Sequence, residues 1–159
     1  MIAVLTDQAP LLRPMREHDL ARVLEVERRA YEFPWTAGIF GDCLRAGYCC
    51  WSLLLGETLI GYAIMVVTLD EAHILNICVD PEYHRRGHAQ RLLDQLLALA
   101  VRHRASMVFL EVRPTNVAAR HLYMRNGFSQ IALRRGYYPA REGREDALVL
   151  SKNFPDPHE

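Results

Sequence analysis

A basic loop in front of a strongly patterned helix is the segment of this sequence whose residues most clearly suggest chemistry. It runs from Asp80 to Gln90 and reads DPEYHRRGHAQ. Gly87 and Ala89 keep the turn free of large side chains, so a ligand can approach the main chain closely. The N–H groups and the dipole at the start of the helix favour an anion, and neighbouring arginines add positive charge. The segment therefore predicts a cradle for a pyrophosphate, with an ordinary strand-to-helix turn carrying solvated arginines as the alternative.

Other common nucleotide and metal sites are excluded by the residue types. Lys152 is the only lysine, so no Gly-rich loop leads to the lysine of a Walker-type phosphate site, and no G-x-G-x-x-G sequence marks a nicotinamide site. The four cysteines form no C-x-x-C pair and share no metal-ligand spacing with the histidines, which predicts no metal site. Surface or capping roles are expected for His73, His84, His88, His103 and His121. Cys78 has no evident histidine partner for acyl transfer, so we expect it to be a small buried hydrophobe.

Length and composition indicate one globular domain rather than a disordered, fibrous or membrane protein. The 159 residues are 50% hydrophobic and 24% charged, and 19 basic residues balance 19 acidic ones. A net charge of zero gives no bulk attraction to nucleic acid or to anionic lipid. The long apolar region 53–69 is interrupted by glycines and is expected to be a hairpin, not a membrane span. We expect a single cytoplasmic domain over 1–159, with short flexible ends near 1–8 and 153–159.

Hydrophobic periodicity predicts the elements that must position these residues. Strands are expected at 11–15, 48–55, 58–69, 73–79, 107–112, 131–137 and 147–150, and helices at 18–30, 36–47, 89–101 and 116–126. Thr36 and Asn116 are expected as helix N-caps. The apolar run 107–112 is typical of a strand covered on both faces, and Val101 is placed on the buried face of its helix. Strands with interleaved helices give an α/β fold around one mixed sheet.

The basic loop also carries the first resemblance to a known family. The segment 85–89, RRGHA, lies between a strand and a helix and looks like the acetyl-coenzyme A signature Q/R-x-x-G-x-G/A of the GNAT acetyltransferases. His84 departs from the Gln or Arg of the first position, which loosens one polar contact and leaves the glycine and the small residue in place. The resemblance implies a GNAT fold, an α/β (α+β) architecture with a single mixed, mostly antiparallel central sheet flanked by about four helices.

Segments on both sides of the loop extend the resemblance over nearly the whole chain, from about Leu12 to Leu150. Three segments resemble the second half of the same fold: LEVRPTNVAA at 110–119, LY at 122–123 and NGF at 126–128. A narrower likeness lies in FPW at 33–35, NICV at 76–79, YYP at 137–139 and GREDA at 143–147. These segments are similar to the RimI-type family, bacterial enzymes that acetylate the N-terminal alanine of a small-subunit ribosomal protein.

The resemblance assigns roles to two residues whose roles the sequence alone leaves open. It implies that Glu111 is the base that accepts the amine proton and that Tyr123 is the acid that protonates the departing thiolate. By itself, Glu111 near the end of an apolar strand is either a buried proton acceptor or an ion-pair partner of Arg113 or Arg120. Tyr123 is either that donor or a core aromatic at helical spacing.

The remaining site residues follow from the resemblance in three groups. Main-chain groups of Ile77, Cys78 and Val79 are expected to meet the pantetheine, and Asn116 is expected to touch the cofactor. The pyrophosphate is expected to bind at Arg85, Arg86, Gly87, His88, Ala89 and Gln90. The cleft that binds the acceptor is expected to be lined by Phe33, Trp35, Tyr137 and Tyr138. Arg134 and Arg135, shortly before the last two, are expected to be solvated.

These assignments predict an N-terminal α-amine acetyltransferase that uses acetyl-coenzyme A (acetyl-CoA) as cosubstrate and needs no metal. Transfer would be direct in a ternary complex, and the acceptor would be the N-terminal alanine of small-subunit ribosomal protein eighteen. A GNAT enzyme acting on a small-molecule amine or a lysine side chain is the alternative among enzymes. A non-catalytic acyl-CoA-binding module is the alternative of another class. Glu111 and Tyr123 argue against that module, and the tyrosines at 137–138 argue for a peptide substrate.

Overall fold

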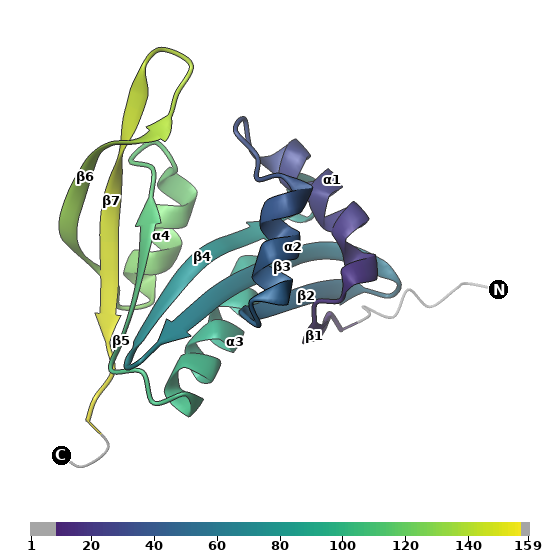
Figure 1. The fold of residues 1–159 in the computed structure, drawn as a ribbon, viewed down its shortest axis with the longest axis horizontal. Helices are drawn as coiled ribbons and strands as arrows, with labels where there is room; N and C mark the ends of the chain where they lie inside the picture. Colours follow the sequence, from purple (N-terminus) through teal and green to yellow (C-terminus); the bar gives the residue numbers. More distant parts are fainter. Residues whose placement is uncertain (1–8, 157–159) are drawn as a thin grey trace. The chain divides into compact units, whose positions relative to one another are not determined.

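The computed structural model describes residues 9–156, and their strands form one seven-stranded sheet in the order β1-β2-β3-β4-β5-β7-β6 (Figure 1). The pairing of β4 with β5 is parallel, whereas β1 with β2, β5 with β7 and β6 with β7 are antiparallel. Together with four α-helices in the described residues, this mixed, mostly antiparallel sheet confirms the predicted fold class. Contacts divide the chain into two compact units, one containing residues up to Ile64 and Asn76–Leu93, the other Met65–Leu75 and Asp94 onwards.

All the predicted strands and helices are present, with small changes of boundary. The strands are β1 (Leu11–Pro14), β2 (Cys49–Leu55), β3 (Thr58–Thr68), β4 (Glu71–Val79), β5 (Met107–Val112), β6 (Ser129–Pro139) and β7 (Arg144–Asn153). The helices are α1 (Leu20–Ala30), α2 (Ala37–Arg45), α3 (His88–Arg102) and α4 (Val117–Arg125), with short 3₁₀ helices η1 (Glu17–Asp19) and η2 (Pro81–Tyr83). Within the described range, no helix is long and apolar enough to cross a membrane.

The predicted flexible ends fall largely on residues that the structure does not describe. Residues 1–8 and 157–159 lie outside the described residues. In the rest of the predicted C-terminal segment, Asn153 is the last residue of β7, and the Phe154 N–H donates to the Ser106 carbonyl oxygen at 2.9 Å.

In the first unit, helices α1 and α2 cover one face of the strands (Figure 1). The ring of Tyr62 on β3 meets Phe40 of α2 edge to face, with centroids 5.6 Å apart, and the Tyr62 hydroxyl donates to Glu27 Oε1 at 2.7 Å. Gly61 points to the opposite face because successive strand residues alternate. A Cβ at Gly61 would lie 2.8 Å from a backbone carbonyl oxygen and 3.3 Å from Leu92 Cδ1, so glycine allows α3 to begin this close to the strand.

In the second unit, β5 pairs along its whole length with β7, and β7 pairs with the edge strand β6. Contrary to prediction, β5 is not covered equally on both faces. Val108, Leu110 and Val112 are buried, whereas the alternate residues are less completely buried, so one face belongs to the core and the other can carry polar side chains. Val101 was also misplaced, since its side chain is 57% exposed. It follows the buried Ala100 by one residue, a rotation of about 100° around the helix.

Candidate active site

The basic loop between β4 and α3 has the backbone geometry of an anion cradle. Arg85 has φ 65° and Gly87 has φ 78°, both in the left-handed region, which is costly for a residue with a side chain. Left-handed residues beside right-handed ones turn neighbouring N–H groups towards one concavity. A Cβ on Gly87 would have no neighbouring protein atom within 4 Å, so the space above the main chain is open. Because the first N–H groups of an α-helix have no acceptor within the helix, this open space can take an anion.

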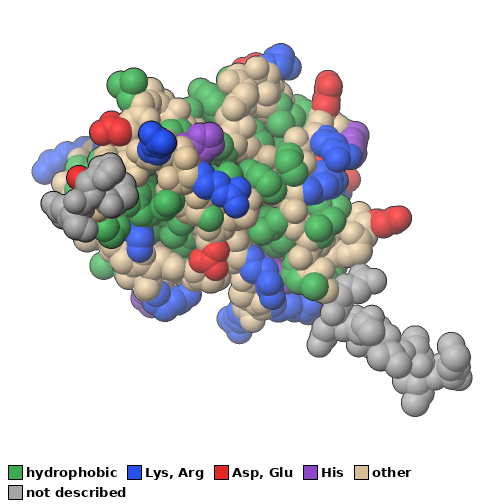
Figure 2. Space-filling view, turned by 90° about the horizontal axis from the view of Figure 1, so that it is seen from below, with side chains coloured by type: hydrophobic (Ala, Val, Ile, Leu, Met, Phe, Trp, Pro, Cys, Tyr) green, Lys and Arg blue, Asp and Glu red, His purple; other side chains and the backbone are tan. Residues whose placement is uncertain are grey.

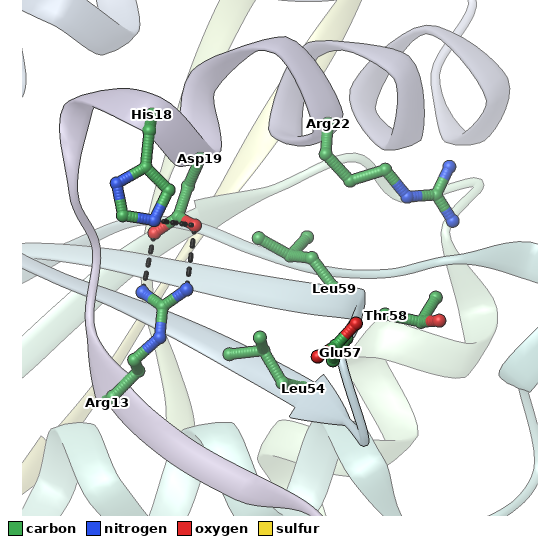
Figure 3. Close-up of a pocket in the computed structure, with 8 residues that line it drawn as sticks. All are labelled: Arg13, His18, Asp19, Arg22, Leu54, Glu57, Thr58 and Leu59. Atoms are coloured by element: carbon green, nitrogen blue, oxygen red, sulfur yellow. Dashed lines mark hydrogen bonds and ion pairs between the residues drawn. The ribbon is translucent and has the colours of Figure 1, made fainter.

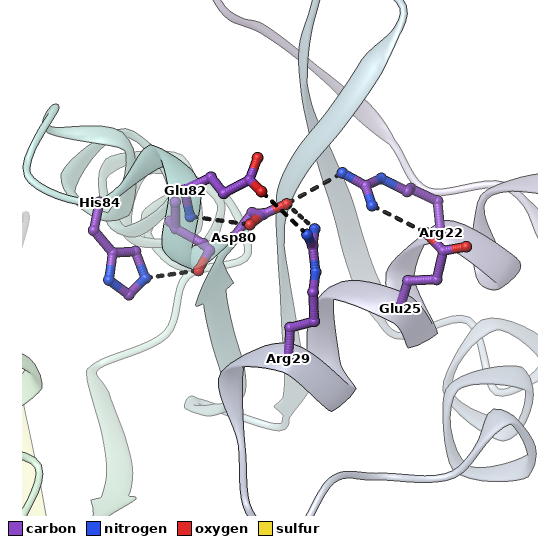
Figure 4. A network of polar contacts seen from close by, with 7 residues as sticks. Arg22, Glu25, Arg29, Asp80, Glu82 and His84 are labelled. Carbon is purple, nitrogen blue, oxygen red and sulfur yellow. Dashed lines mark hydrogen bonds and ion pairs between the residues drawn. The ribbon is translucent and has the colours of Figure 1, made fainter.

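Two histidines of this loop make contacts that the sequence did not reveal. His84, at the first position of the GNAT signature, has Nε2 2.8 Å from the Val79 carbonyl oxygen and ties the loop to the end of β4 (Figure 4). His88 is 7% exposed and its Nδ1 has no hydrogen-bond partner, so the expected surface role is wrong for this residue. Burial, and then the nearby Arg91 and Arg86, lower the pKa of His88, so its ring is neutral at pH 7.

A buried carboxylate fixes the strand end from which the loop departs. Asp80 is fully buried and accepts hydrogen bonds from Arg29 and from Arg22 Nη2, the latter at 3.1 Å (Figure 4). Its Oδ1 also accepts from the Glu82 N–H at 3.1 Å, at the start of η2. These donors compensate for the burial of the charge. The sequence analysis missed this cluster because the two arginines lie 58 and 51 residues before Asp80.

The end of β4 extends beyond the ladder that this strand forms with β5. In the described chain this ladder stops at His73, although β4 continues to Val79. The Ile77 carbonyl oxygen accepts from the Tyr31 hydroxyl at 3.1 Å. Burial raises the pKa of the Cys78 thiol to about 12. Such a thiol is not a nucleophile at neutral pH, in agreement with the expected role of Cys78 as a small hydrophobe.

In the second unit, Glu111 near the end of β5 is buried with one oxygen occupied and the other without a hydrogen bond. Its side chain is 7% exposed, and Oε2 lies 2.6 Å from Nε2 of His73 on β4. Oε1 has no hydrogen-bond partner, and Nη2 of Arg134 lies 3.7 Å from it. A buried carboxylate oxygen that no donor reaches is uncommon in folded proteins. This oxygen is therefore a candidate for direct contact with a reacting group.

The partners of Glu111 differ from both predicted ones. Arg113 donates instead to Glu145 Oε1 at 3.1 Å, and Arg120 donates to a backbone carbonyl oxygen at 3.0 Å. His73, which was expected at the surface or at a cap, has a side chain that is only 25% exposed. The ion-pair alternative therefore fails in the form in which it was predicted, and the contact of His73 with Glu111 was not predicted from the sequence.

Tyr123 and Asn116 lie at the two ends of α4. Tyr123 is 7% exposed, and its ring centroid lies 5.5 Å from that of Phe128. Burial raises the pKa of Tyr123, so the phenol keeps its proton at neutral pH and can act as a donor. Asn116 caps the helix as predicted, since its Oδ1 accepts from the Ala119 N–H at 3.2 Å. Its contact with a cofactor stays a prediction.

The predicted aromatic walls lie in both units and are held by different contacts. In the first unit, Phe33 is 40% exposed, and the Trp35 main-chain N–H donates to Glu27 Oε2 at 3.1 Å. In the second unit, Tyr137 and Tyr138 on β6 meet edge to face with centroids 4.8 Å apart. The contact of all four residues with an acceptor stays a prediction.

Arginines flank the two tyrosines of β6. Cζ of Arg134 lies 5.4 Å from the Tyr137 ring centroid, and Cζ of Arg113 lies 4.3 Å from that of Tyr138. Arg134 was expected to be solvated, but its half-exposed side chain contacts this ring and approaches Glu111. Burial, and then the negative charge of Glu111, raise the pKa of Tyr138. The tyrosines and Glu111 therefore share one electrostatic environment.

A pocket in the first unit contains none of the predicted site residues (Figure 3). It is lined by Arg13, His18, Asp19, Arg22, Leu54, Glu57, Thr58 and Leu59. Arg13 donates to both carboxylate oxygens of Asp19, at 2.7 and 2.8 Å, and this contact holds the pKa of Asp19 at about 2. The Arg13–Asp19 ion pair joins β1 to the start of α1.

The described residues show neither a concentrated basic patch on the face in Figure 2 nor a metal-binding group. On the face shown in Figure 2, Lys and Arg side chains are spread among hydrophobic ones rather than gathered in one patch. Among the described residues, no group of three His, Cys, Asp or Glu side chains could hold a metal ion. The features that could do chemistry are the open main-chain cradle, the half-satisfied carboxylate and the buried phenol.

Comparison with known proteins gives one family. Residues 15–128 match the acetyltransferase (GNAT) family. The chain is 38% identical over 133 residues to the [ribosomal protein bS18]-alanine N-acetyltransferase of Escherichia coli (strain K12), covering 84% of this chain and 90% of that protein. It is 30% identical over 141 residues to the putative enzyme of the same name from Bacillus subtilis (strain 168), with 87% and 92% coverage.

Solved structures agree with the sequence comparison. The crystal structure of the ribosomal-protein-alanine N-acetyltransferase from Escherichia coli matches with a TM-score of 0.87 and 33% identity, covering 95% of this chain and 99% of that one. Ard1 from Thermoplasma volcanium shares the fold, with a TM-score of 0.84 at 22% identity over 93% of this chain and 99% of its own. The chain belongs to the acetyltransferase (GNAT) family and is an N-acetyltransferase that uses acetyl-CoA.

Proposed function

We propose that this chain acetylates the α-amine at the N-terminus of a protein, with the N-terminal alanine of ribosomal protein bS18 as its acceptor. The acceptor is supported by the Escherichia coli relative, which is named for that reaction and is 38% identical over most of this chain. The observation that carries the chemistry is the buried carboxylate of Glu111, whose Oε1 accepts no hydrogen bond. A ribosomal acceptor would place the enzyme in the cytoplasm.

Acetyl-CoA is proposed to bind at the loop 85–90 and the end of β4. The N–H groups at the start of α3 would receive the pyrophosphate, and Arg85 and Arg86 would add positive charge. The open space above Gly87 supports this placement, because a ligand there meets main chain rather than side chain. Main-chain groups of the segment 77–79 would meet the pantetheine amides, and Asn116 would contact the cofactor.

Glu111 and Tyr123 are proposed to divide the two proton transfers. Glu111 accepts a proton from the acceptor amine as its nitrogen attacks the thioester carbonyl, so that a C–N bond forms and the C–S bond breaks. Tyr123 gives its hydroxyl proton to the departing thiolate, and the products are an amide and the thiol of coenzyme A. Solvent then removes the proton from Glu111 and returns one to Tyr123. Transfer is direct, in a ternary complex, and uses no acyl-enzyme.

The aromatic residues Phe33, Trp35, Tyr137 and Tyr138 are proposed to enclose the acceptor. A protein N-terminus has no residue before it, whereas an internal lysine lies within a continuous chain on both sides. Large, stiff rings exclude the second arrangement more easily than flexible side chains do. The exposed ring of Phe33 and the edge-to-face pair on β6 are suited to this task.

Mass spectrometry of acetylated peptides tests this function. Peptides that begin with Ala, Ser, Gly or Met and carry one internal Lys are incubated with the protein and acetyl-CoA, and fragmentation locates the acetyl group. We expect acetylation of the α-amine, fastest for the peptide that begins with Ala. Acetyl on the internal Lys with free α-amines untouched would replace the proposed acceptor by a lysine side chain, and no transfer to any peptide would favour a small-molecule amine.

A further inference from the structure

We propose that His73 is a positioning residue that binds Oε2 of Glu111 and thereby leaves Oε1 as the one oxygen that accepts the amine proton. This inference rests on the proposed function, in which Glu111 is the base. It adds a residue that neither the sequence motifs nor the family match assigns. Three features of the second unit carry it: the fixed place of the imidazole, the unequal environments of the two oxygens, and the charges around them.

The imidazole of His73 is fixed by its neighbours on β5. In the parallel ladder, His73 lies opposite Phe109, and the two rings stack with centroids 4.2 Å apart and an interplanar angle of 15°. Phe109 and Glu111 lie on the same face of β5 because they are two residues apart. The stacked ring therefore reaches along this face to the carboxylate, where Nε2 and Oε2 are 2.6 Å apart.

The two carboxylate oxygens of Glu111 consequently differ in what they can do. The terminal carboxylate torsion of glutamate is broad, so an unrestrained carboxylate would present either oxygen to a reacting amine. With Oε2 bound and the side chain 7% exposed, rotation would break a short hydrogen bond in a buried place. Oε1 keeps its acceptor capacity, since no hydrogen bond uses it.

The charged and titratable groups around Glu111 leave the buried Oε1 without a hydrogen bond. From β4, His73 contacts Oε2, and from β6, Arg134 lies 3.7 Å from Oε1 with a side chain that is 52% exposed. Tyr138 on β6 is the other titratable group close enough to feel the charge of Glu111. Immediately after β5, Arg113 donates a hydrogen bond to Glu145. An amine that donates to Oε1 would therefore complete the hydrogen bonds of the carboxylate.

Two substitutions separate positioning from packing and from proton relay. His73→Phe keeps a planar ring to stack on Phe109 but has no nitrogen to hold Oε2. His73→Gln loses the ring but can present a side-chain N–H to the same oxygen. His73→Leu serves as a second variant without a donor if the Phe variant does not fold. Steady-state rates are measured on an N-terminal Ala peptide, with thermal unfolding of each variant alongside.

We expect His73→Phe to lower kcat by about 10- to 100-fold, because a small misplacement of a catalytic group can cost that much. KM for acetyl-CoA should stay near the wild-type value, and His73→Gln should recover most of the lost kcat. Wild-type kcat in both His73→Phe and His73→Leu would overturn the proposal. A Gln variant that folds but is as slow as the Phe variant would also overturn it, since a relay through the ring would then be needed.

A double-mutant comparison distinguishes failure of this inference from failure of the proposed function. If His73 acts through Glu111, adding His73→Phe to Glu111→Gln should slow the enzyme little beyond Glu111→Gln alone. Full, independent losses from the two substitutions would contradict the positioning role while leaving the base intact. A Glu111→Gln enzyme as fast as the wild type, or a wild type inactive on α-amines, would instead remove the proposed function itself.

Discussion

The two units of the chain each hold a buried carboxylate, and they hold it in opposite ways. Asp80, at the end of β4, is surrounded by donors from two arginines and a main-chain N–H. Glu111, near the end of β5, has His73 on one oxygen and no hydrogen bond on the other. A fully satisfied buried carboxylate stabilises the local structure, whereas an incompletely satisfied one costs free energy that folding alone does not explain. From this difference we propose that Asp80 serves the fold and Glu111 the reaction.

The groups that would meet substrate differ in the same way. The cradle beside Asp80 consists of main-chain groups shaped by the left-handed residues Arg85 and Gly87. In the second unit, the proposed chemistry depends on single side-chain atoms, the Oε1 of Glu111 and the hydroxyl of Tyr123. Substitutions near the cradle should therefore act on cofactor affinity, and substitutions near Glu111 should act on the rate of transfer.

The largest effect is expected from Glu111→Gln. The substitution keeps the shape of the side chain and an acceptor for His73, but it removes the proposed base. Loss of a general base typically costs about 10²- to 10⁴-fold in rate. The loss should be greatest at low pH and shrink as the acceptor amine, with a pKa of about 7.7–8.0, loses its proton unaided. Pre-steady-state rates across pH, measured beside melting temperatures, check this.

The melting temperature of Glu111→Gln also distinguishes the role of Glu111 from that of Asp80. Its melting temperature should change little, because Oε1 makes no hydrogen bond in the native state. Asp80→Asn provides the contrast, since it weakens contacts with Arg22 and Arg29 and should lower the melting temperature clearly. A Glu111→Gln variant that loses stability but keeps its turnover would reverse the two roles.

A somewhat smaller effect is expected from Tyr123→Phe, which removes only one hydroxyl. Turnover should fall by about a hundredfold, as for loss of a general acid, with cofactor affinity unchanged. Because burial keeps the phenol protonated at neutral pH, the effect should be nearly constant from pH 6 to 9. Single-turnover rates and calorimetric titration with coenzyme A measure the two quantities. Near-wild-type turnover would identify Tyr123 as a core aromatic only.

Gly87→Val should weaken binding of coenzyme A by about 10- to 100-fold. The side chain would enter the open space where the N–H groups of the cradle are proposed to meet phosphate. Gly47→Val is the matched control, because Gly47 has a similar φ of 74° and also has open space at the Cβ position. Both variants carry comparable backbone strain, so only Gly87→Val should change the affinity measured by calorimetry. Equal affinities in the two folded variants would mean that the cradle is misplaced.

The smallest effect concerns a satisfied carboxylate outside the predicted site. Arg13 holds the pKa of Asp19 at about 2, below the value of about 3.9 in an unfolded chain. The pair therefore contributes about 2 kcal/mol to the free energy of unfolding above pH 5, and this is lost as the pH falls towards 2. Asp19→Asn should lower stability at pH 7 by about that amount without changing turnover.

The control for this prediction is Asp42→Asn, which removes an exposed ion pair with Arg45. Exposed pairs contribute about 0.5 kcal/mol or less, so its unfolding curve should match the wild type at every pH. Denaturant unfolding at pH 7 and at pH 2.5 compares the two variants. A stability loss in Asp19→Asn that is the same at both pH values would contradict the electrostatic explanation.

Local signals predicted the elements of the fold well. Thr36 and Asn116 cap their helices because their side-chain oxygens accept main-chain N–H groups three residues on, a contact that depends only on neighbours. Gly127, with φ 88°, ends the α4 segment for an equally local reason. The hairpins and the amphipathic helices also follow from short-range periodicity.

Sequence motifs predicted the candidate site residues but not the contacts between residues that are far apart in the sequence. His73 and Glu111 meet because β4 and β5 pair in a parallel register, and no local pattern sets the register of strands 38 residues apart. The predicted partners of Glu111 follow it in the sequence, whereas the observed ones come from other strands, His73 from β4 and Arg134 from β6. Asp80 and its arginines were missed for the same reason.

N-terminal acetylation is tested most directly by a competition between two peptides of identical sequence, beginning with alanine and containing one internal lysine. One peptide has a free N-terminus, and the other is blocked by formyl. Both are incubated in one tube with the protein and acetyl-CoA, and tandem mass spectrometry locates every acetyl group. An N-terminal acetyltransferase should place acetyl on the α-amine of the free peptide and none on the blocked peptide. Acetyl on the lysine of the blocked peptide would contradict this function.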